Sequence, residues 1–549
     1  MEADNSTRQL PPPEVTAATT PNKRPHEADE LSPMKAIKKR QKQDTASEQD
    51  APPEVKAGES SKAAEKRPSE RKHKESRKSA RDRREAEKAV GKRRGTRPEG
   101  ESPPQTEESG SKAPRLPKRM SAMLIGFCGA GYNGMQIQKD AKTIEGTLFD
   151  ALVKAGAVSE DNADAATKVS LNRAARTDAG VHAAGNLVSL KLITRVPGVP
   201  DILARINEEL PPEIRVWQIA RVQNSFNARS MCDSRKYTYY FPSYLLLPPK
   251  PGSGLQKTLA EQVNSDPAPH PFWSEIPADS SPAEDLLRKR HWRATPEHIE
   301  ALREIVQKYE GSHNFHNFTV GREFSDRSAS RFMKKIEVSD PTVHGETEWI
   351  SVSLHGQSFM LHQIRKMIAA VILVCRTGTP PSIIEELYGP RMLFVPKMPA
   401  LGLLLEYPIF QSYNKKIEQF TTLDPESNDY RAAIDFEALK EQLEAFKQEF
   451  IYSRMRSIED RDGIFDAWIR SVDHYTGHDL LYLNPKGIIP TNAVIKRNER
   501  REKPFREKRR FDATSFPVGK QPAIDVEDEE DEEEEEEKLD KKALLEMEG

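Results

Sequence analysis

The chain has 549 residues, of which 31% are charged, yet its formal net charge is only -2. This near-neutral total hides segments of opposite sign, because residues 81–84 and 92–94 are basic runs and residues 525–537 form an acidic block. The three cysteines are far apart, which predicts neither a disulfide framework nor a zinc site. We find no apolar stretch of signal-peptide type and no uncharged apolar run of about 18 residues, so we expect neither secretion nor a membrane span.

Residues 1–118 contain almost no aromatic or branched aliphatic side chains, which predicts a disordered basic arm. Basic clusters of this kind are typical of nuclear import signals and of sequence-independent phosphate contacts. We therefore expect a nuclear protein that binds import receptors. Residues 496–549 are predicted to be a disordered tail, first basic and then acidic. The acidic block could shield a basic surface until RNA displaces it, or both tails could simply maintain solubility.

Order is predicted to begin at residue 119, and residues 119–220 are predicted to form a first sheet-and-helix subdomain. Residues 120–127 predict a buried strand that leads into a glycine-rich turn. Thr143 predicts the N-cap of a helix that ends at Gly156. Residues 169–171 predict a short strand, and the alternation of apolar and polar side chains over 187–192 predicts an antiparallel strand with one covered face.

Residues 221–410 are predicted to form a second subdomain of the same kind. A segment rich in Pro, Ser and Gly, residues 248–282, predicts a surface insertion within it. Residues 411–495 predict a helical extension. The expected fold is α+β, with two subdomains of largely antiparallel mixed sheets around a central cleft. The remaining predicted strands are 215–222, 235–241, 331–338 and 349–355, and the remaining predicted helices are 296–309, 359–374 and 432–459.

Three glycines after the first strand, Gly129, Gly131 and Gly134, satisfy the G-x-G-x-x-G spacing of dinucleotide-binding loops. In such a loop the last glycine opens a helix whose N-terminus meets the pyrophosphate. Here residues 135–142 separate Gly134 from the first helical pattern. We therefore interpret the segment as an ordinary glycine turn.

The stretch from Arg173 to His182 is the most informative part of the chain. Asp178-Ala-Gly180 favours a tight turn, and Arg176 beside Asp178 would on its own suggest a surface ion pair. Residues 176–182, 235–239 and 359–365, taken together, change that interpretation. Arg-Thr-Asp-Ala-Gly-Val-His at 176–182 resembles the catalytic loop of TruA-type pseudouridine synthases.

The two other active-site segments of that family have counterparts in the same order. They are Arg-Lys-Tyr-Thr-Tyr at 235–239 and Phe-Met-Leu-His-Gln-Ile-Arg at 359–365. The likeness extends from about residue 120 to 407, and residues 226–242 with the charged tails look most like the eukaryotic nuclear branch of the family. Met135 stands where many bacterial relatives have Trp, and the insertion has no bacterial counterpart, so substrate choice is less defined than chemistry.

The resemblance implies an isomerase that converts uridine to pseudouridine in RNA, within a central RNA-binding cleft, without a cofactor or a metal ion. The reaction breaks the bond from C1′ to N1, turns the base and rejoins it through C5. A carboxylate can attack C1′ to form a sugar ester or remove the C2′ proton to form a glycal, and the sequence leaves both routes open. The resemblance assigns this carboxylate to Asp178, and makes Arg365 the cation that holds its pKa down.

The same resemblance gives roles to further side chains. Tyr237 is expected to stack on uracil and to accept the C5 proton directly or through water, and Arg176 to fill the space left by the extruded nucleotide. Simpler interpretations are that Tyr237 is a sheet aromatic and that Arg365 only caps a carbonyl. The residues expected to bind RNA are Tyr132, Gln136, Arg235, Lys236, His362 and Gln363.

The implied substrate is tRNA, with small nuclear RNA and mRNA as further candidates, and the implied state is a monomer. The main alternative is a non-catalytic nuclear RNA-binding protein, which the basic arm alone would satisfy. A nucleotide-dependent dehydrogenase or methyltransferase is the alternative that the glycines suggest. The sequence does not identify the modified uridines or the role of residues 411–495.

Overall fold

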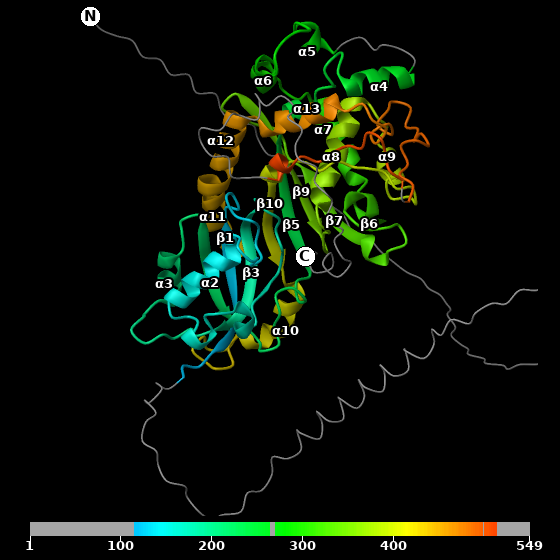
Figure 1. The fold of residues 1–549 in the computed structure, drawn as a ribbon. Helices are drawn as coiled ribbons and strands as arrows, with labels where there is room; N and C mark the ends of the chain where they lie inside the picture. The colour runs from blue at the N-terminus through cyan, green and yellow to red at the C-terminus, as the bar shows by residue number, and fades with distance from the viewer. Residues whose placement is uncertain (1–114, 264–269, 498, 513–549) are drawn as a thin grey trace, which may run out of the picture. The chain divides into compact units, whose positions relative to one another are not determined.

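The computed structural model describes residues 115–263, 270–497 and 499–512, and the structural statements below concern these ranges. The strands form one mixed sheet in the order β4-β1-β3-β10-β5-β9-β7-β6, with β2 beside β3 and β8 beside β9 (Figure 1). Their bounds are β1 Arg119–Phe127, β2 Asn172–Arg173, β3 His182–Leu192, β4 Ile214–Arg221, β5 Ser234–Pro242, β6 Gly311–Asn314, β7 Ser330–Val338, β8 Thr342–His344, β9 Thr347–Gly356 and β10 Leu403–Ile409.

Helices cover both faces of this sheet, which confirms the predicted α+β class. Thr143 is the N-cap of the first described helix, as predicted, and its side chain accepts a hydrogen bond from the Gly146 amide. None of the helices in the described ranges combines the length and apolarity needed to cross a membrane. The helices are α2 Ile144–Lys154, α3 Ile202–Glu209, α4 Gly254–Val263, α5 Pro271–Ser274, α6 Pro282–His291, α7 Pro296–Gln307, α8 Gln363–Thr377, α9 Ile383–Glu386, α10 Gln411–Thr421, α11 Lys440–Phe446, α12 Ser453–Asp462 and α13 Ile464–His474, with a π-helical stretch, Lys447–Tyr452, between α11 and α12.

Strand β10 joins the two halves of the chain. It pairs in parallel with β3, where Leu405 lies opposite Ala183, and antiparallel with β5, where Leu405 lies opposite Tyr237. The strands of both predicted subdomains therefore belong to one continuous sheet, and the boundary at residue 220 stays a prediction. Only one strand, β10, therefore separates β5 from β3 and from the loop that precedes β3.

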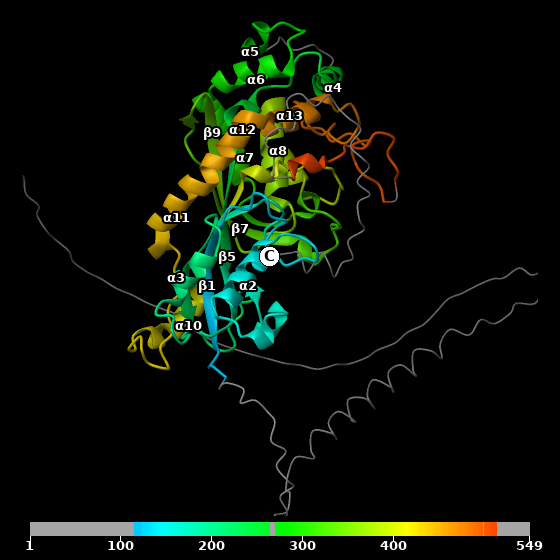
Figure 2. The same cartoon turned by 60° about the vertical axis from the view of Figure 1, so that its left-hand side comes forward.

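Successive side chains of β5 point to opposite faces of the sheet, as the pleat requires. Tyr239 bonds through its hydroxyl to the Pro399 carbonyl, at 2.5 Å, on the face that carries α8. Tyr240 meets Tyr452 on the other face, where the two hydroxyls lie 2.5 Å apart. Figure 2 shows α11 along one side of the sheet and α8 on the other.

The helical stretch from α11 to α12, which belongs to the extension at 411–495, packs against the sheet. Phe446 packs edge-on against Trp217 of β4, with ring centroids 5.2 Å apart, while Tyr452 packs against Tyr240 of β5 at 4.9 Å. One helix therefore contacts strands from both halves of the chain. Burial of each such large side chain contributes roughly 1.5–3 kcal/mol, so the helix stabilises the junction at β10.

The insertion at 248–282 and the first part of the predicted tail are both packed against the body. In the insertion, the Gln262 carbonyl accepts a hydrogen bond from Lys486 at 2.6 Å, and Lys289 of α6 lies over the ring of the buried Trp273. Residues 499–512 were expected to be disordered, but Phe511 is buried and Phe505 packs on Phe394. Apolar side chains inside a charged run explain this difference. Residues 1–114 and 513–549 lie outside the described residues, so the predictions for them stay predictions.

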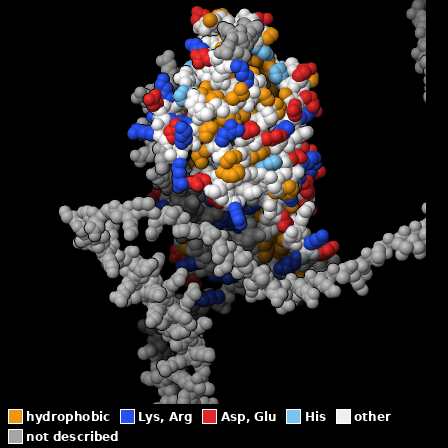
Figure 3. Space-filling model, turned by 90° about the vertical axis from the view of Figure 1, so that its right-hand side faces the viewer, with side chains coloured by type: hydrophobic (Ala, Val, Ile, Leu, Met, Phe, Trp, Pro, Cys, Tyr) orange, Lys and Arg blue, Asp and Glu red, His pale blue; other side chains and the backbone are white. Residues whose placement is uncertain are grey.

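The visible surface on one side of the molecule mixes side-chain types. Figure 3 shows hydrophobic side chains among Lys and Arg and among Asp and Glu on that face. A surface with interspersed charges produces only a weak field of either sign. The visible part of this face therefore shows no concentration of positive side chains of the kind that binds a polyanion.

Candidate active site

A pocket of about 50 Å³ lies between the loop 174–181, strand β5 and the N-terminal end of α8. Sites for small molecules usually measure roughly 300–1,000 Å³, so side chains must move before a nucleoside can enter. The described residues that line it are Arg176, Thr177, Asp178, Val181, Arg235, Tyr237, Phe359, Met360, Leu361, His362, Gln363, Ile364 and Leu403. Six of the ten predicted site residues are among them.

The loop that carries Asp178 is a tight turn on a fixed stem. The amide of Val181 donates to the Asp178 carbonyl at 3.2 Å, and Gly180 has φ +74°, the positive value that a type II turn needs at its third position. At the stem, the Asn186 side chain accepts from the Ala175 amide at 3.2 Å and donates to the Ala175 carbonyl at 3.0 Å. The predicted turn is confirmed.

The glycine-rich segment braces this loop. The Met135 amide donates to the Thr177 carbonyl at 3.1 Å, and the Gly180 amide donates to the Tyr132 carbonyl at 3.2 Å. Gly134 has φ +79°, and a Cβ added there would lie 2.8 Å from the Thr177 carbonyl oxygen. Only a glycine lets the two backbones approach this closely, so the segment has a structural task other than nucleotide binding.

A buried acid that we did not single out from the sequence ties three segments together. Glu145, in the first turn of α2, pairs with Arg173, whose Nη2 lies 2.9 Å from its Oε2, and that oxygen also accepts from the Ile137 amide at 3.1 Å. Burial raises the pKa of Glu145 although the Arg173 charge opposes this. The ion pair fixes the start of the segment 173–182 relative to α2.

The carboxylate of Asp178 contacts His362, with Nδ1 and Oδ2 3.2 Å apart. Burial favours the neutral acid, but the hydrogen bond from His362 and the charges of His362 and Arg365 outweigh it, so the pKa of Asp178 lies below its ordinary value. The charge of Asp512 acts in the opposite direction. Asp178 is therefore ionised at neutral pH.

His362 is held in an unusual backbone conformation at the N-cap of α8. Its φ is +59°, in the left-handed region that costs non-glycine residues about 1–2 kcal/mol. The next side chain, Gln363, is buried and accepts from the Met360 amide at 2.9 Å, which stabilises the chain entering the helix. Strain of this kind often accompanies a functional geometry, and here it directs the imidazole at Asp178.

Tyr237 lines the pocket from β5. Its ring packs edge-on against Phe359, with centroids 5.1 Å apart. Burial raises the pKa of Tyr237; the Arg235 charge opposes this, and the Asp178 charge adds to it. Tyr237 is therefore a neutral phenol, and its environment includes the carboxylate.

The structure gives Arg235 and Lys236 different surroundings. Arg235 is buried and donates to two backbone carbonyls, to Ala174 at 2.6 Å and to Gln357 at 3.1 Å, so it links the loop stem to the end of β9. Lys236 lies on the opposite face of β5, where it donates to the Tyr407 hydroxyl at 2.8 Å. Strand alternation therefore directs Lys236 away from the pocket.

Two other residues predicted to bind RNA also lie outside the pocket lining. Tyr132 is buried, and its hydroxyl donates to Glu213 at 3.1 Å while Lys142 lies over its ring. Gln136 is half-buried on the glycine-rich segment. Arg176 does line the pocket and is half-buried, and its charge lowers the pKa of Glu145.

Arg365 is buried behind the pocket. Its Nε donates to the Met398 carbonyl at 2.6 Å, and its Nη2 donates to Asp512 Oδ1 at 2.5 Å. Its charge lowers the pKa of Asp178, as expected, but the side chain in direct contact with the Asp178 carboxylate is His362. The sequence predicts RNA binding for His362 and no role for Asp512.

Comparison with known proteins identifies the family of the chain. The family model described as tRNA pseudouridine synthase matches residues 305–411, a range that includes His362 and Arg365 but not Asp178 or Tyr237. Relatives with more than 30% identity extend the similarity over most of the chain. The chain belongs to the tRNA pseudouridine synthase family, whose members are isomerases.

Within that family the chain is similar to proteins named tRNA pseudouridine synthase 1. It is 41% identical to the protein of that name from Candida glabrata, over 68% of this chain and 74% of the relative, and 36% identical to the one from Schizosaccharomyces pombe, over 71% and 89%. It is also 40% identical to the tRNA pseudouridine(27/28) synthase of Saccharomyces cerevisiae, over 54% and 85%.

The close approach at Gly134 can be tested with a matched pair of alanine variants. Gly131 and Gly134 both have φ near +80°, so alanine strains the backbone at either position by about 1–2 kcal/mol. Only at Gly134 does the new Cβ meet the Thr177 carbonyl, whereas nothing lies within 4 Å at Gly131. We expect Gly134→Ala to lose far more pseudouridine formation than Gly131→Ala when both are assayed well below their unfolding temperatures. Equal activities would contradict the bracing role.

The contact between His362 and Asp178 predicts a change in pH dependence. A depressed carboxylate pKa means that activity is present above this pKa and is lost as pH falls through it. His362→Ala removes the hydrogen bond, so the pKa of Asp178 should rise and the acid limb of kcat/KM should move to higher pH. His362→Asn is the control, because Asn tolerates the left-handed backbone and keeps an N–H donor. An unmoved acid limb in the alanine variant would refute the interaction.

Proposed function

We propose that this chain converts uridine to pseudouridine in tRNA and that Asp178 is its catalytic carboxylate. The observation that carries the proposal is an ionised carboxylate on a fixed turn, facing a pocket that it shares with Tyr237 and His362. Family membership and the names of the relatives support tRNA as the substrate. An ionised carboxylate can react at the ribose, and the aromatic ring of Tyr237 beside it can stack on the base that the ribose carries.

The carboxylate can act by either of two routes. In the first, Asp178 attacks C1′, the bond to N1 breaks with its electron pair leaving on the base, and C5 of the turned base then displaces the carboxylate. In the second, Asp178 removes the C2′ proton as the base leaves, and returns that proton when C5 adds to C1′ of the glycal. Both routes need the carboxylate in its ionised form, which the low pKa of Asp178 provides.

Tyr237 is proposed to orient the base by stacking. Because its phenol is neutral and its pKa is raised, it is a poor direct base for the C5 proton. The proton at C5 therefore passes to water, with the phenol hydroxyl serving as a hydrogen-bonding group, and N1 of the turned base takes up a proton from water, so that the product is an isomer of the substrate. This favours the indirect form of the role expected from the resemblance.

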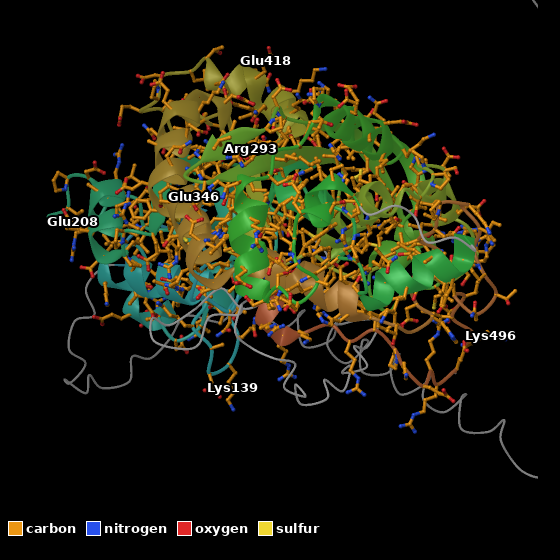
Figure 4. The ribbon with its side chains drawn as sticks, turned by 90° about the horizontal axis from the view of Figure 1, so that it is seen from above. Lys139, Glu208, Arg293, Glu346, Glu418 and Lys496 are labelled. Carbon is orange, nitrogen blue, oxygen red and sulfur yellow. The ribbon has the colours of Figure 1, made fainter. Side chains whose placement is uncertain are left out.

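RNA is proposed to approach over the glycine-rich segment and the loop 174–181. Arg176 lines the pocket and would occupy the place of the extruded nucleotide, since chemistry on a stacked base requires flipping. Beyond Gly134, Ile137 is 41% exposed, and Lys139 projects outward from the same segment (Figure 4). An exposed lysine here suits a phosphate contact.

The proposal is tested by replacing the carboxylate with its amide. In Asp178→Asn we expect pseudouridine formation, measured as release of tritium from C5 of uridine in tRNA, to fall below detection. Binding of tRNA, measured by filter retention, should persist, because phosphate contacts dominate affinity. The control is Glu208→Gln, which neutralises an exposed acid on α3 and should retain activity (Figure 4).

The same variant decides against the alternative function. A non-catalytic RNA-binding protein would show no pseudouridine formation in either the wild type or Asp178→Asn. Retained activity in Asp178→Asn would leave the enzyme in place but remove Asp178 from its mechanism. Mapping pseudouridine in cells with and without this protein would define the targets, for which small nuclear RNA and mRNA are proposed beside tRNA.

The basic arm is proposed to direct a monomeric enzyme to the nucleus through import receptors. We expect deletion of residues 1–118 to leave kcat nearly unchanged, because β1 begins at Arg119, and to move a fluorescently tagged protein out of the nucleus. Fusion of residues 1–118 to a cytoplasmic reporter is the matched gain-of-function control. A nuclear signal that is unchanged by the deletion would remove the import role.

A further inference from the structure

Residues 499–512, which we call the C-terminal strap, are attached to the body at several points. The ring of Phe505 lies 5.3 Å from that of Phe394, and its amide donates to Asp479 Oδ2 at 2.6 Å. Arg501 pairs with the same Asp479 carboxylate, and Phe511 is buried at the other end of the strap. These contacts bring the last described residue, Asp512, to a defined place behind the pocket.

The strap supplies negative charge to a cluster of cations in the core. Asp512 Oδ2 lies 2.7 Å from Lys397 Nζ, and its Oδ1 lies 2.5 Å from Arg365 Nη2. Glu507 Oε1 accepts from the Lys397 amide at 2.9 Å. Burial opposes the charge of Asp512, but Arg365 and Lys397 outweigh it and bring the pKa of Asp512 to about 2. One strap carboxylate is thus shared by two buried cations.

The guanidinium of Arg365 is held from two directions. Its Nε is fixed by the Met398 carbonyl and its Nη2 by Asp512, so the planar group cannot rotate without breaking a charged hydrogen bond. The side chain is only 1% exposed, and a buried cation without a carboxylate partner is strongly unfavourable. Asp512 therefore both orients the guanidinium and neutralises it.

We propose that Asp512 is a positioning residue for the reaction, which holds Arg365 where its charge acts on Asp178. This inference rests on the proposed function of Asp178. The division of contacts is consistent with it, since Asp178 has His362 as its direct partner while Arg365 acts on it through space. Asp512 is then a part of the active site that lies more than 300 residues from Asp178 in the sequence.

The test compares two acid-to-amide changes on the strap of the full-length protein. Asp512→Asn removes the charge that holds Arg365, whereas Glu507→Gln keeps an oxygen acceptor for the Lys397 amide and leaves the bond from Arg365 to Asp512 intact. We expect Asp512→Asn to lower kcat on the order of 10–100-fold, because a catalytic group displaced by about 1 Å can cost 100-fold. KM for tRNA should change little, and Glu507→Gln should retain kcat.

Two further measurements separate positioning from a purely structural role. Asp512→Glu keeps a carboxylate and should recover part of the lost kcat. Because loss of the partner of Arg365 also lowers thermal stability, kcat is measured well below the unfolding midpoint of each variant and per folded enzyme. An unchanged or increased kcat in Asp512→Asn would overturn the proposal, and so would equal losses in the two amide variants. If Asp178→Asn is inactive while Asp512→Asn is fully active, this inference fails and the proposed function stands.

Discussion

The site depends on keeping one carboxylate ionised where burial alone would neutralise it. Asp178 meets this constraint because the hydrogen bond with His362 and the charge of Arg365 help to outweigh the cost of leaving water. His362 supplies the contact and Arg365 supplies charge from behind the pocket. Any displacement of the loop or of the start of α8 would change that balance, and much of the surrounding structure restrains these two segments.

The restraints come from parts of the chain that are distant in sequence. Strand β10 places β3 and β5 on its two sides, so the loop before β3 and the side chain of Tyr237 meet at one pocket. The glycine-rich segment holds the loop 174–181 through backbone hydrogen bonds, and Glu145 ties the start of that loop to α2 through Arg173. The strap completes the set from the C-terminal end. Each restraint uses hydrogen bonds or ion pairs of defined direction, which apolar packing alone could not replace.

Local pattern predicted most elements but not their partners. The strands at 120–127 and 235–241 and the helix cap at Thr143 followed from periodicity and capping, and they are confirmed. The predicted strand at 169–171 was wrong, because a short 3₁₀ turn occupies Ala166–Val169. Residue identity also cannot reveal which face of β5 receives Lys236, a positive φ at His362, or an ion pair between Arg365 and a carboxylate 147 positions away. The resemblance supplied Asp178, whereas its electrostatic surroundings required the fold.

The helix from α11 to α12 has a mechanical consequence for substrate entry. Its aromatic side chains pack on Trp217 of β4 and on Tyr240 of β5, so bending of the sheet at β10 would break both contacts. Widening of the pocket by local movement of side chains and of the turn would leave both contacts intact. Such local opening would preserve the spacing between the Asp178 carboxylate and the Tyr237 ring while a nucleoside enters.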